Sequence, residues 1–498
     1  MLNRIFGLET EYGLLINLER PDHSPTWTAH QIRDHIFQRQ RHGVLDVHHR
    51  GHDEPPGNGG FLTNAGRMYL DMGHLEFASP ECSTLMDLVA SDRAGDRILQ
   101  QALDELGLAD HVSLIRNNID HDTDATFGSH ENYLVSRNFP FSHRGLGLLI
   151  PFLVTRQIFT GAGRIGAAAP DGWIPVIQTV GGRPWLRDAI VTRASIARDM
   201  GPFQISQRAD HIVNDFFQWV QGNRAIVNTR DEPLADPNQF RRIHLLLGDS
   251  NMAELATALK LGTTALVLQL IEEGHCPKGL DIYEPVEALK ELSRDPERRW
   301  LVTLESGKTT NAIDMQEEYL RAAQRHCQGQ DEETDWVLAE WESVLTDLRG
   351  DYTKLVGRVD WASKLWLLES FRQAEKLEWD DPWLKSLDLE YHNLHPEKGL
   401  YWGLAQEGRA RRVTTDSAIA LAEHHPPRNT RAFGRGEVVR HLLESGDATS
   451  EDADPDDRGY PAYVINWSAF QIRGRAPFVM PNPFKTYVQE VRSHLAQR

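Results

Sequence analysis

Hydrophobic and polar positions alternate in two regions near the N-terminus, and this alternation predicts β-strands. From Arg4 to Leu18 we expect a short strand, a polar interruption and a second apolar run. The stretch Phe61 to Ser79 predicts two strands with a tight connection. Mixed strand and helix signals continue to about Gly274, and the pattern from Ile282 to Gln330 is less clear.

Four stretches repeat their apolar residues at helical spacing. The longest, Thr84 to Leu108, predicts an amphipathic helix, and Thr28 to Gln40 has a shorter helical pattern. Met252 to Ile271 predicts an apolar helix. Thr334 to Arg372 is also helical, with one face made of Trp336, Trp341, Leu345 and Leu348. We expect these tryptophans to pack in the core rather than to stack on nucleic-acid bases.

Two further segments lack a regular pattern. His48 to Gly60 is rich in proline, glycine and histidine, which favours a flexible loop. Its histidines, His48, His49 and His52, could bind a metal, but no fourth ligand stands nearby, so a solvated loop is the favoured interpretation. Ser445 to Gly459 is acidic, and alanine is its only apolar residue, which predicts a linker or loop.

Composition narrows the class of protein. The 498 residues are 40% hydrophobic and 25% charged, which is typical of a globular chain, and long enough for one large domain with a smaller one. The formal net charge of -19 disfavours non-specific binding to nucleic acid. No stretch approaches the roughly 20 apolar residues of a spanning helix, so we expect no membrane embedding.

Cysteine content and the N-terminus bear on the compartment. The three cysteines, Cys82, Cys276 and Cys327, argue against a disulfide framework. The first residues lead directly into a motif-bearing strand, which leaves no room for a signal peptide. We therefore expect a cytoplasmic protein. The sequence has neither a P-loop nor a dinucleotide-binding glycine pattern, so a phosphate site would have to be built differently.

Carboxylates cluster on the predicted strands. Glu9 and Glu11 are two residues apart, so both project from the same strand face. Alternation in the second region puts Arg67, Tyr69 and Asp71 on one face and apolar residues on the other. His74, Glu76 and Ser79 follow in the next strand. Magnesium prefers such oxygen ligands and bridges them to nucleotide phosphates. An exposed, solvated sheet face is the alternative.

Arginines supply the complementary charge. Arg208, Arg230, Arg241 and Arg242 occur in polar motifs that interrupt apolar sequence. Guanidinium groups match phosphate oxygens in pairs, so these arginines suit phosphoryl transfer, although any one of them could belong to a structural ion pair.

These motifs, in this order, resemble the Pup ligase and depupylase family, which is related to glutamine synthetase and the γ-glutamylcysteine ligases. The resemblance covers nearly the whole chain. It is carried by GLETEYG, NAGRMYLD, EFASPEC, GSHENYL, TRQIFTGAGRIG, QISQRAD, VNTRDEP, RRIHLLLGDSN, LKLGTTALVL, VDWASKL, LDLEYHN and NTRAFGRG.

The resemblance implies an α+β fold: a large glutamine-synthetase-like domain over residues 1–420, with a curved antiparallel sheet backed by helices, and a small C-terminal domain over 421–498. It also assigns roles. The implied magnesium ligands are Glu9, Tyr69 and Glu76, and the implied nucleotide contacts are Arg67, Ser79 and Trp467. Asp71 matches the catalytic aspartate, and Arg208 and Arg230 match arginines near the transferring phosphate.

The activity implied is ATP- and magnesium-dependent ligation of a Pup-like modifier to lysine side chains of target proteins, with a link to a bacterial proteasome. The alternative is the depupylase reaction, in which the same aspartate cleaves the isopeptide bond. Asn482-Pro483-Phe484 favours the ligases, and the short step from Asp71 to Glu76 favours the hydrolases. Leu234 and Asn393 depart from both patterns. A non-catalytic modifier-binding module is the remote third possibility.

An acidic modifier would need a locally basic groove on this acidic chain. The sequence offers Arg409, Arg411 and Arg412, followed by Arg431 and Arg435. A solvated basic turn is the equal alternative.

Overall fold

The computed structural model describes residues 4–16, 24–50, 54–120, 125–166, 174–180, 183–189, 202–218, 224–445 and 461–497, with only the backbone of 174–180 and 183–189. His52 lies outside these residues, and so does nearly all of the acidic segment expected at Ser445 to Gly459.

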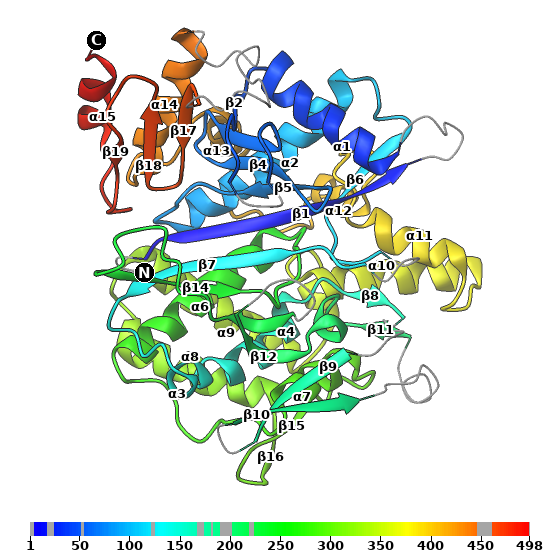
Figure 1. Cartoon of the computed structure of the whole chain (residues 1–498). Coiled ribbons are helices and arrows are strands. Elements are labelled where there is room, and N and C mark those ends of the chain that lie inside the picture. The colour runs from blue at the N-terminus through cyan, green and yellow to red at the C-terminus, as the bar shows by residue number, and fades with distance from the viewer. Residues whose placement is uncertain are drawn as a thin grey trace.

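One large sheet organises the described part of the chain (Figure 1). Its strands lie in the order β12-β13-β14-β7-β1-β5-β4-β3-β2, with β6 paired to the far end of β1. All pairs are antiparallel except β12 with β13, so the expected antiparallel sheet is confirmed with one parallel pair at its edge. The strands are β1 (Phe6–Ile16), β2 (Gly43–Leu45), β3 (Gly59–Leu62), β4 (Arg67–Asp71), β5 (His74–Ala78), β6 (Val112–Ile115), β7 (Ser129–Ser136), β12 (Asn214–Phe217), β13 (Ala225–Asn228) and β14 (Phe240–Leu245).

Strand β1 is the centre of the sheet. The sequence pattern predicted an interruption at its polar residues, and that prediction is wrong, because the strand runs unbroken for 11 residues. Its first half pairs with β5 on one side and β7 on the other, and its second half pairs with β6. The polar residues Glu9 and Glu11 keep strand geometry because both of their neighbours supply ladder hydrogen bonds.

Helices fill the core next to the sheet. The predicted long helix is α2 (Leu85–Glu105), capped by Thr84, whose hydroxyl accepts from the Asp87 main chain at 3.1 Å. α2 packs on β1 and on α6 (Glu254–Glu272), and α6 contacts β7. The segment predicted from Thr334 forms two helices, α9 (Glu332–Leu348) and α10 (Asp360–Glu375), and Trp341 is fully buried between packed rings, as expected of a core residue.

The remaining described elements complete the layers around this core. The helices are α1 (Pro25–Asp34), η1 (His35–Arg39), α3 (His143–Gly147), α4 (Ile150–Thr160), η2 (Ala209–His211), α7 (Pro285–Arg294), α8 (Ala312–Cys327), η3 (Tyr352–Leu355), α11 (Pro382–Glu390), α12 (Leu400–Gln406), α13 (Asp416–His424), α14 (Ala432–Ser445) and α15 (Val488–Leu495). The small sheets are β8 (Arg164–Ile165) with β11 (Phe203–Gln204), β9 (Ile174–Val180) with β10 (Arg183–Ala189), β15 (Leu301–Thr303) with β16 (Thr309–Asn311), and β17 (Tyr463–Ile465), β18 (Ala469–Ile472) and β19 (Phe478–Val479).

Helix α6 corrects one expectation. By length and hydropathy it is the single described helix that could cross a membrane, whereas the sequence was expected to contain no such stretch. In the structure 94% of that apolar window is buried inside the protein. Its hydrophobic character is therefore that of a central core helix.

The C-terminal elements gather at one end of the large sheet (Figure 1, orange and red). Their hydrophobic cluster, built on β17, β18, α14 and α15, also contains Val44 of β2 and Phe61 of β3. Because this core is shared with the large sheet, the expected separate C-terminal domain is not confirmed, and a boundary at residue 420 stays a prediction.

A candidate nucleotide and metal site along strand β1

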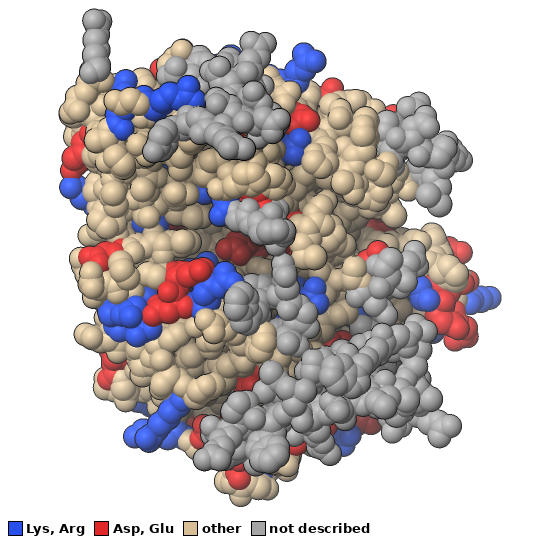
Figure 2. All heavy atoms as spheres, viewed as in Figure 1, with Lys and Arg blue, Asp and Glu red and all other residues tan. Residues whose placement is uncertain are grey.

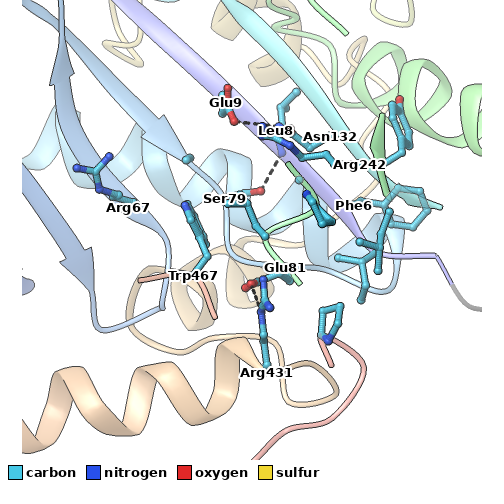
Figure 3. Close-up of a pocket in the computed structure, with 18 of the residues that line it drawn as sticks. Phe6, Leu8, Glu9, Arg67, Ser79, Glu81, Asn132, Arg242, Arg431 and Trp467 are labelled. Carbon is cyan, nitrogen blue, oxygen red and sulfur yellow. Dashed lines mark hydrogen bonds and ion pairs between the residues drawn. The ribbon is translucent and has the colours of Figure 1, made fainter. Parts of the chain in front are cut away.

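A pocket opens beside the first half of β1, between the large sheet and the C-terminal elements (Figure 3). Polar groups line one part of it, among them Glu9, Arg67 and Ser79. Trp467 lines it from the C-terminal sheet, and Phe6 lies across from Trp467. An apolar slot with convergent polar groups is the usual form of a small-molecule site.

The nucleotide contacts implied by the resemblance all line this pocket. Arg67 is 6% exposed, and its guanidinium lies 4.3 Å from the centre of the Tyr69 ring. Two acids hold it, Asp46 at 3.0 Å and Glu54 at 2.5 Å. The Ser79 hydroxyl accepts from the Leu8 main chain at 3.0 Å, which leaves its own O–H available as a donor.

The strand alternation predicted for β4 is confirmed. Met68 and Leu70 are buried in the hydrophobic cluster between the sheet and α2, whereas Arg67 and Tyr69 face the pocket. In the β4–β5 ladder, Tyr69 lies opposite Glu76 and is hydrogen-bonded to it. Burial and the charges of Glu76 and Glu9 raise the pKa of Tyr69 well above its usual value, so the phenol holds its proton here.

Glu9 lies between two histidines from neighbouring strands. His130 Nδ1 of β7 is 3.1 Å from Glu9 Oε2, and His244 Nε2 of β14 is 3.7 Å from the same oxygen. Asn132 donates to the other carboxylate oxygen at 3.0 Å. Burial would raise the pKa of Glu9, but its hydrogen bond with His130 and the proximity of His244 lower it well below its usual value. The three potential ligand atoms lie within 4.8 Å of one another, close enough to share one ion.

Glu11, Asp71 and Glu76 form a second group with ligand atoms within 4.8 Å. Burial and the charges of Glu11, Glu9 and Asp71 raise the pKa of Glu76 well above its usual value. Burial and the charge of Glu11 also raise the pKa of Asp71. Carboxylates that repel one another in a buried site are stabilised by a cation, and an all-oxygen group of this kind fits magnesium.

A glycine makes room for this group. A Cβ atom on Gly128 would stand 2.3 Å from Glu11 Oε1, nearer than any atoms can pack. His74 Nδ1, across the β4–β5 turn, is 3.6 Å from Glu11 Oε2. The expected magnesium ligands Glu9 and Glu76 fall in two different groups, one of a carboxylate with two histidines and one of three carboxylates, while Tyr69 bonds to Glu76. The ligand set as a whole stays a prediction.

The structure places the two arginines expected near the transferring phosphate, Arg208 and Arg230, in different surroundings. Arg208 is 1% exposed and lies close enough to Glu11 for the two charges to affect each other. Arg230 does not line the pocket; its guanidinium is 3.5 Å from Glu232. Arg242 does line it, donating to Asn132 Oδ1 at 3.0 Å and standing 3.6 Å from the same Glu232. Arg230 and Arg242 thus share Glu232, and of the two Arg242 lines the pocket.

Several groups in the site were not singled out from the sequence. His130 and His244 occur in the motifs GSHENYL and RRIHLLLGDSN but were given no role, whereas Arg242 was among the arginines expected to suit phosphoryl transfer. The alternation within each of those strands could have indicated them, since His130 and Asn132 share a face and Glu131 points to the other, where it meets the buried Arg156.

Four of the five arginines suggested for docking an acidic modifier are already paired with acids, and the fifth, Arg409, lies 4.2 Å from the centre of the Trp366 ring. Arg411 is 2.7 Å from Glu340, and Arg412 is 2.7 Å from Glu254. Arg431 and Arg435 are buried against Glu81, on the C-terminal side of the pocket. Figure 2 shows acidic and basic residues interspersed on the face with β7 and β14 rather than one basic patch.

Comparisons with known proteins agree with this geometry. The family model described as Pup-ligase protein matches residues 4–451. A depupylase of Acidothermus cellulolyticus is 36% identical over 475 residues, covering 88% of each chain, and a Pup–protein ligase of Nocardioides is 37% identical over 457 residues, covering 89% of this chain and 91% of the relative. A Pup deamidase/depupylase of Mycolicibacterium smegmatis is 39% identical over 397 residues, covering 79% and 74%.

Solved structures give the same answer. The crystal structure of the complex between the prokaryotic ubiquitin-like protein Pup and its ligase PafA is similar with a TM-score of 0.79 and 30% identity, covering 99% of this chain and 90% of the ligase. PafA in complex with ADP gives 0.73 at 30% identity, covering 98% and 95%. With its fold, its carboxylate strand and these relatives, the chain belongs to the Pup-ligase family of enzymes.

Proposed function

We propose that this enzyme uses ATP to join the C-terminal residue of Pup, or a Pup-like protein, to lysine side chains of target proteins in the cytoplasm, as a tag for proteasomal degradation. The observation that carries the proposal is the order of groups along β1. The pocket lies at Glu9, and the carboxylate group that includes Asp71 lies at Glu11, two residues on. A nucleotide and an acceptor carboxylate can thus meet over one strand.

Each part of the site has a role in this reaction. Arg67, Ser79 and Trp467 would hold the nucleotide. Glu9, Tyr69 and Glu76 would hold magnesium, which when bound neutralises phosphate charge. Arg208 and Arg230 would stabilise the charge that develops on the transferred phosphoryl group.

The chemistry has two stages. An oxygen of the modifier's carboxylate takes the γ-phosphoryl group of ATP, and ADP leaves. The lysine nitrogen then attacks the activated carbonyl and phosphate leaves, while Asp71 takes the proton that the amine must lose. The raised pKa of Asp71 suits a general base, because its conjugate acid is weaker than a solvent-exposed carboxylic acid.

The second candidate function is cleavage of the same bond: hydrolysis of the Pup–lysine isopeptide bond, with a nucleotide retained in the pocket. Relatives named for ligation and for depupylation are similar to this chain at 36–39% identity. The short step from Asp71 to Glu76 is one of the features of the chain that favour hydrolysis, together with Thr63-Asn64 and the segments 163–166 and 261–264.

One experiment separates the two. The purified protein is mixed with ATP, magnesium, Pup and a lysine-bearing protein, and in parallel with a preformed Pup conjugate. Ligation predicts that conjugate accumulates in the first mixture and that ADP is produced in proportion. Loss of conjugate in the second mixture, with none formed in the first, would overturn ligation in favour of hydrolysis.

A further inference from the structure

One arginine next to the nucleotide pocket uses all of its hydrogen-bond donors without lining the pocket. Arg435 lies on α14 and is fully buried, whereas Arg431, just before that helix, lines the pocket. A guanidinium group has five N–H donors, and the guanidinium of Arg435 donates five hydrogen bonds. An arginine used so completely holds its partners in one arrangement.

These hydrogen bonds join three segments of the chain. Nε and Nη2 of Arg435 donate to the main-chain oxygen of Ala65, in the turn between β3 and β4, at 3.2 and 2.8 Å. Nη1 donates to Glu81 Oε1, beyond the end of β5, at 3.1 Å, and Nη2 donates to Glu81 Oε2. Nη1 also donates to the main-chain oxygen of Trp467, between β17 and β18, at 2.8 Å. Arg435 therefore connects the C-terminal sheet to the large sheet.

Arg435 also contacts the aromatic ring of Trp467. Its guanidinium carbon lies 4.8 Å from the centre of that ring and 5.1 Å from the centre of the Phe61 ring. The two rings meet edge to face, with their centres 5.1 Å apart and their planes at 85°. A cation over an aromatic face is attracted to it, and more strongly where water is excluded. One side chain thus holds both the main chain and the ring of Trp467, and that ring lines the pocket with Arg67 and Ser79 (Figure 3).

We infer that Arg435 is a positioning residue for the nucleotide base: it fixes the Trp467 indole in the orientation in which a base stacks on it. This inference rests on the proposed function, in which Trp467 contacts the nucleotide. Stacking of a base on an aromatic side chain depends on the relative orientation of the two rings, so an indole that is free to turn loses part of the interaction. The phosphate chain has no ring to stack, and its binding is therefore independent of Arg435.

Binding of ATP and of inorganic tripolyphosphate, both with magnesium, tests the inference. Each is measured by displacement of a fluorescent nucleotide, and the ratio of the two Kd values gives the contribution of the nucleoside. In Arg435→Lys the Kd of ATP should rise roughly fivefold to tenfold, because an ammonium group has three donors and no planar fork with which to hold Trp467. The Kd of tripolyphosphate should stay within about twofold of the wild-type value.

Two further variants make the result specific to Trp467. Arg440→Lys is the matched control, since Arg440 lies on the same helix and donates to the Thr63 main-chain oxygen at 3.3 Å, and it should bind both ligands as the wild type does. Trp467→Leu should weaken ATP binding by itself. Adding Arg435→Lys to Trp467→Leu should then raise the Kd of ATP by no more than about twofold, because the two residues act through one ring.

Three results would show that the inference is wrong: unchanged ATP affinity in Arg435→Lys, an equal loss of affinity for ATP and tripolyphosphate, or additive effects of the two substitutions. If chemical unfolding shows that Arg435→Lys is not folded, Glu81→Gln combined with Arg435→Gln replaces it, because this pair removes a buried acid together with a buried cation, and the same outcomes apply. A wild-type enzyme that binds ATP no better than tripolyphosphate, or a Trp467→Leu variant with wild-type ATP affinity, would instead overturn the nucleotide contact in the proposed function, and the inference with it.

Discussion

Arg67 Nη2 and Glu54 Oε2 are 2.5 Å apart, so an acid from the loop between β2 and β3 holds the arginine expected to contact the nucleotide. Glu54 is partly exposed, while Asp46, the second acid on Arg67, is buried. A nucleotide phosphate would have to compete with Glu54 for the guanidinium. The contact therefore sets part of the cost of nucleotide binding.

We predict that Glu54→Gln strengthens ATP binding, because the amide is a weaker partner for Arg67. A partly exposed ion pair is worth up to about 1 kcal/mol, which corresponds to roughly a fivefold lower Kd. Titration with a fluorescent nucleotide measures the change. Glu375→Gln, at the exposed end of α10, is the control. Weaker binding in Glu54→Gln would mean that Glu54 orients Arg67 instead of competing for it.

Asp71→Asn should abolish conjugation while ATP affinity stays within about threefold. The amide keeps the size of the side chain but cannot accept the proton of an attacking amine. Conjugate formation on gels and nucleotide titration give the two measurements. Activity near the wild-type level would remove Asp71 from the reaction.

Glu9→Gln should raise the magnesium concentration needed for half-maximal activity by about tenfold. The neutral amide is a poorer ligand for a hard cation, and it leaves His130 and His244 without their shared acid. Initial rates over a magnesium series test this. An unaltered magnesium dependence would show that Glu9 does not bind the ion.

Glu81→Gln should destabilise the junction between the large sheet and the C-terminal elements. Glu81 is buried against Arg431 and Arg435, and loss of its charge leaves both cations buried without an acid, at a cost of about 3–5 kcal/mol. Chemical unfolding of the variant measures the loss. Glu437→Gln, which disturbs a more exposed pair with Arg440 and Arg492, should cost less than about 1 kcal/mol.

The same residue predicts a pH dependence. Burial would raise the pKa of Glu81, but the charges of Arg435 and Arg431 outweigh it and lower the pKa to about 2. The folded value lies below the unfolded value of roughly 4.3, so the ionised group stabilises the fold fully above that pH. This contribution is lost as the pH falls toward 2. Wild-type stability should therefore decrease more between pH 5 and pH 3 than that of Glu81→Gln, and parallel decreases would contradict the assignment.

Local sequence pattern was sufficient for some of the site and insufficient for the rest. Alternation over five residues correctly separated Arg67 and Tyr69 from Met68 and Leu70, because the face of a strand is a local property. The partners of Glu9 could not be predicted from a local pattern, since His130 and His244 lie on strands that are more than 100 residues away in the sequence. Their registers follow from the global order of the sheet, which no short window contains.

The same distinction explains the errors. The predicted interruption in β1 is absent because Glu9 pairs with both β5 and β7, while Glu11 pairs with β5 and donates its main-chain N–H to Gly128. Likewise, α6 is more hydrophobic than was expected of any stretch of this chain. A helix surrounded on all sides by protein needs no polar face.

Strand β1 has a consequence for how this family can diverge. Its two carboxylates are held by hydrogen-bonded neighbours on both edges, so a shift of one residue would turn Glu9 and Glu11 away from the site and into the core. The positions of these two carboxylates can therefore change only by substitution, and not by a gradual shift of the strand. Ligation and hydrolysis would then use the same fixed strand. Differences between the two activities would come from the loops next to it, such as the loop that brings Glu54 to Arg67.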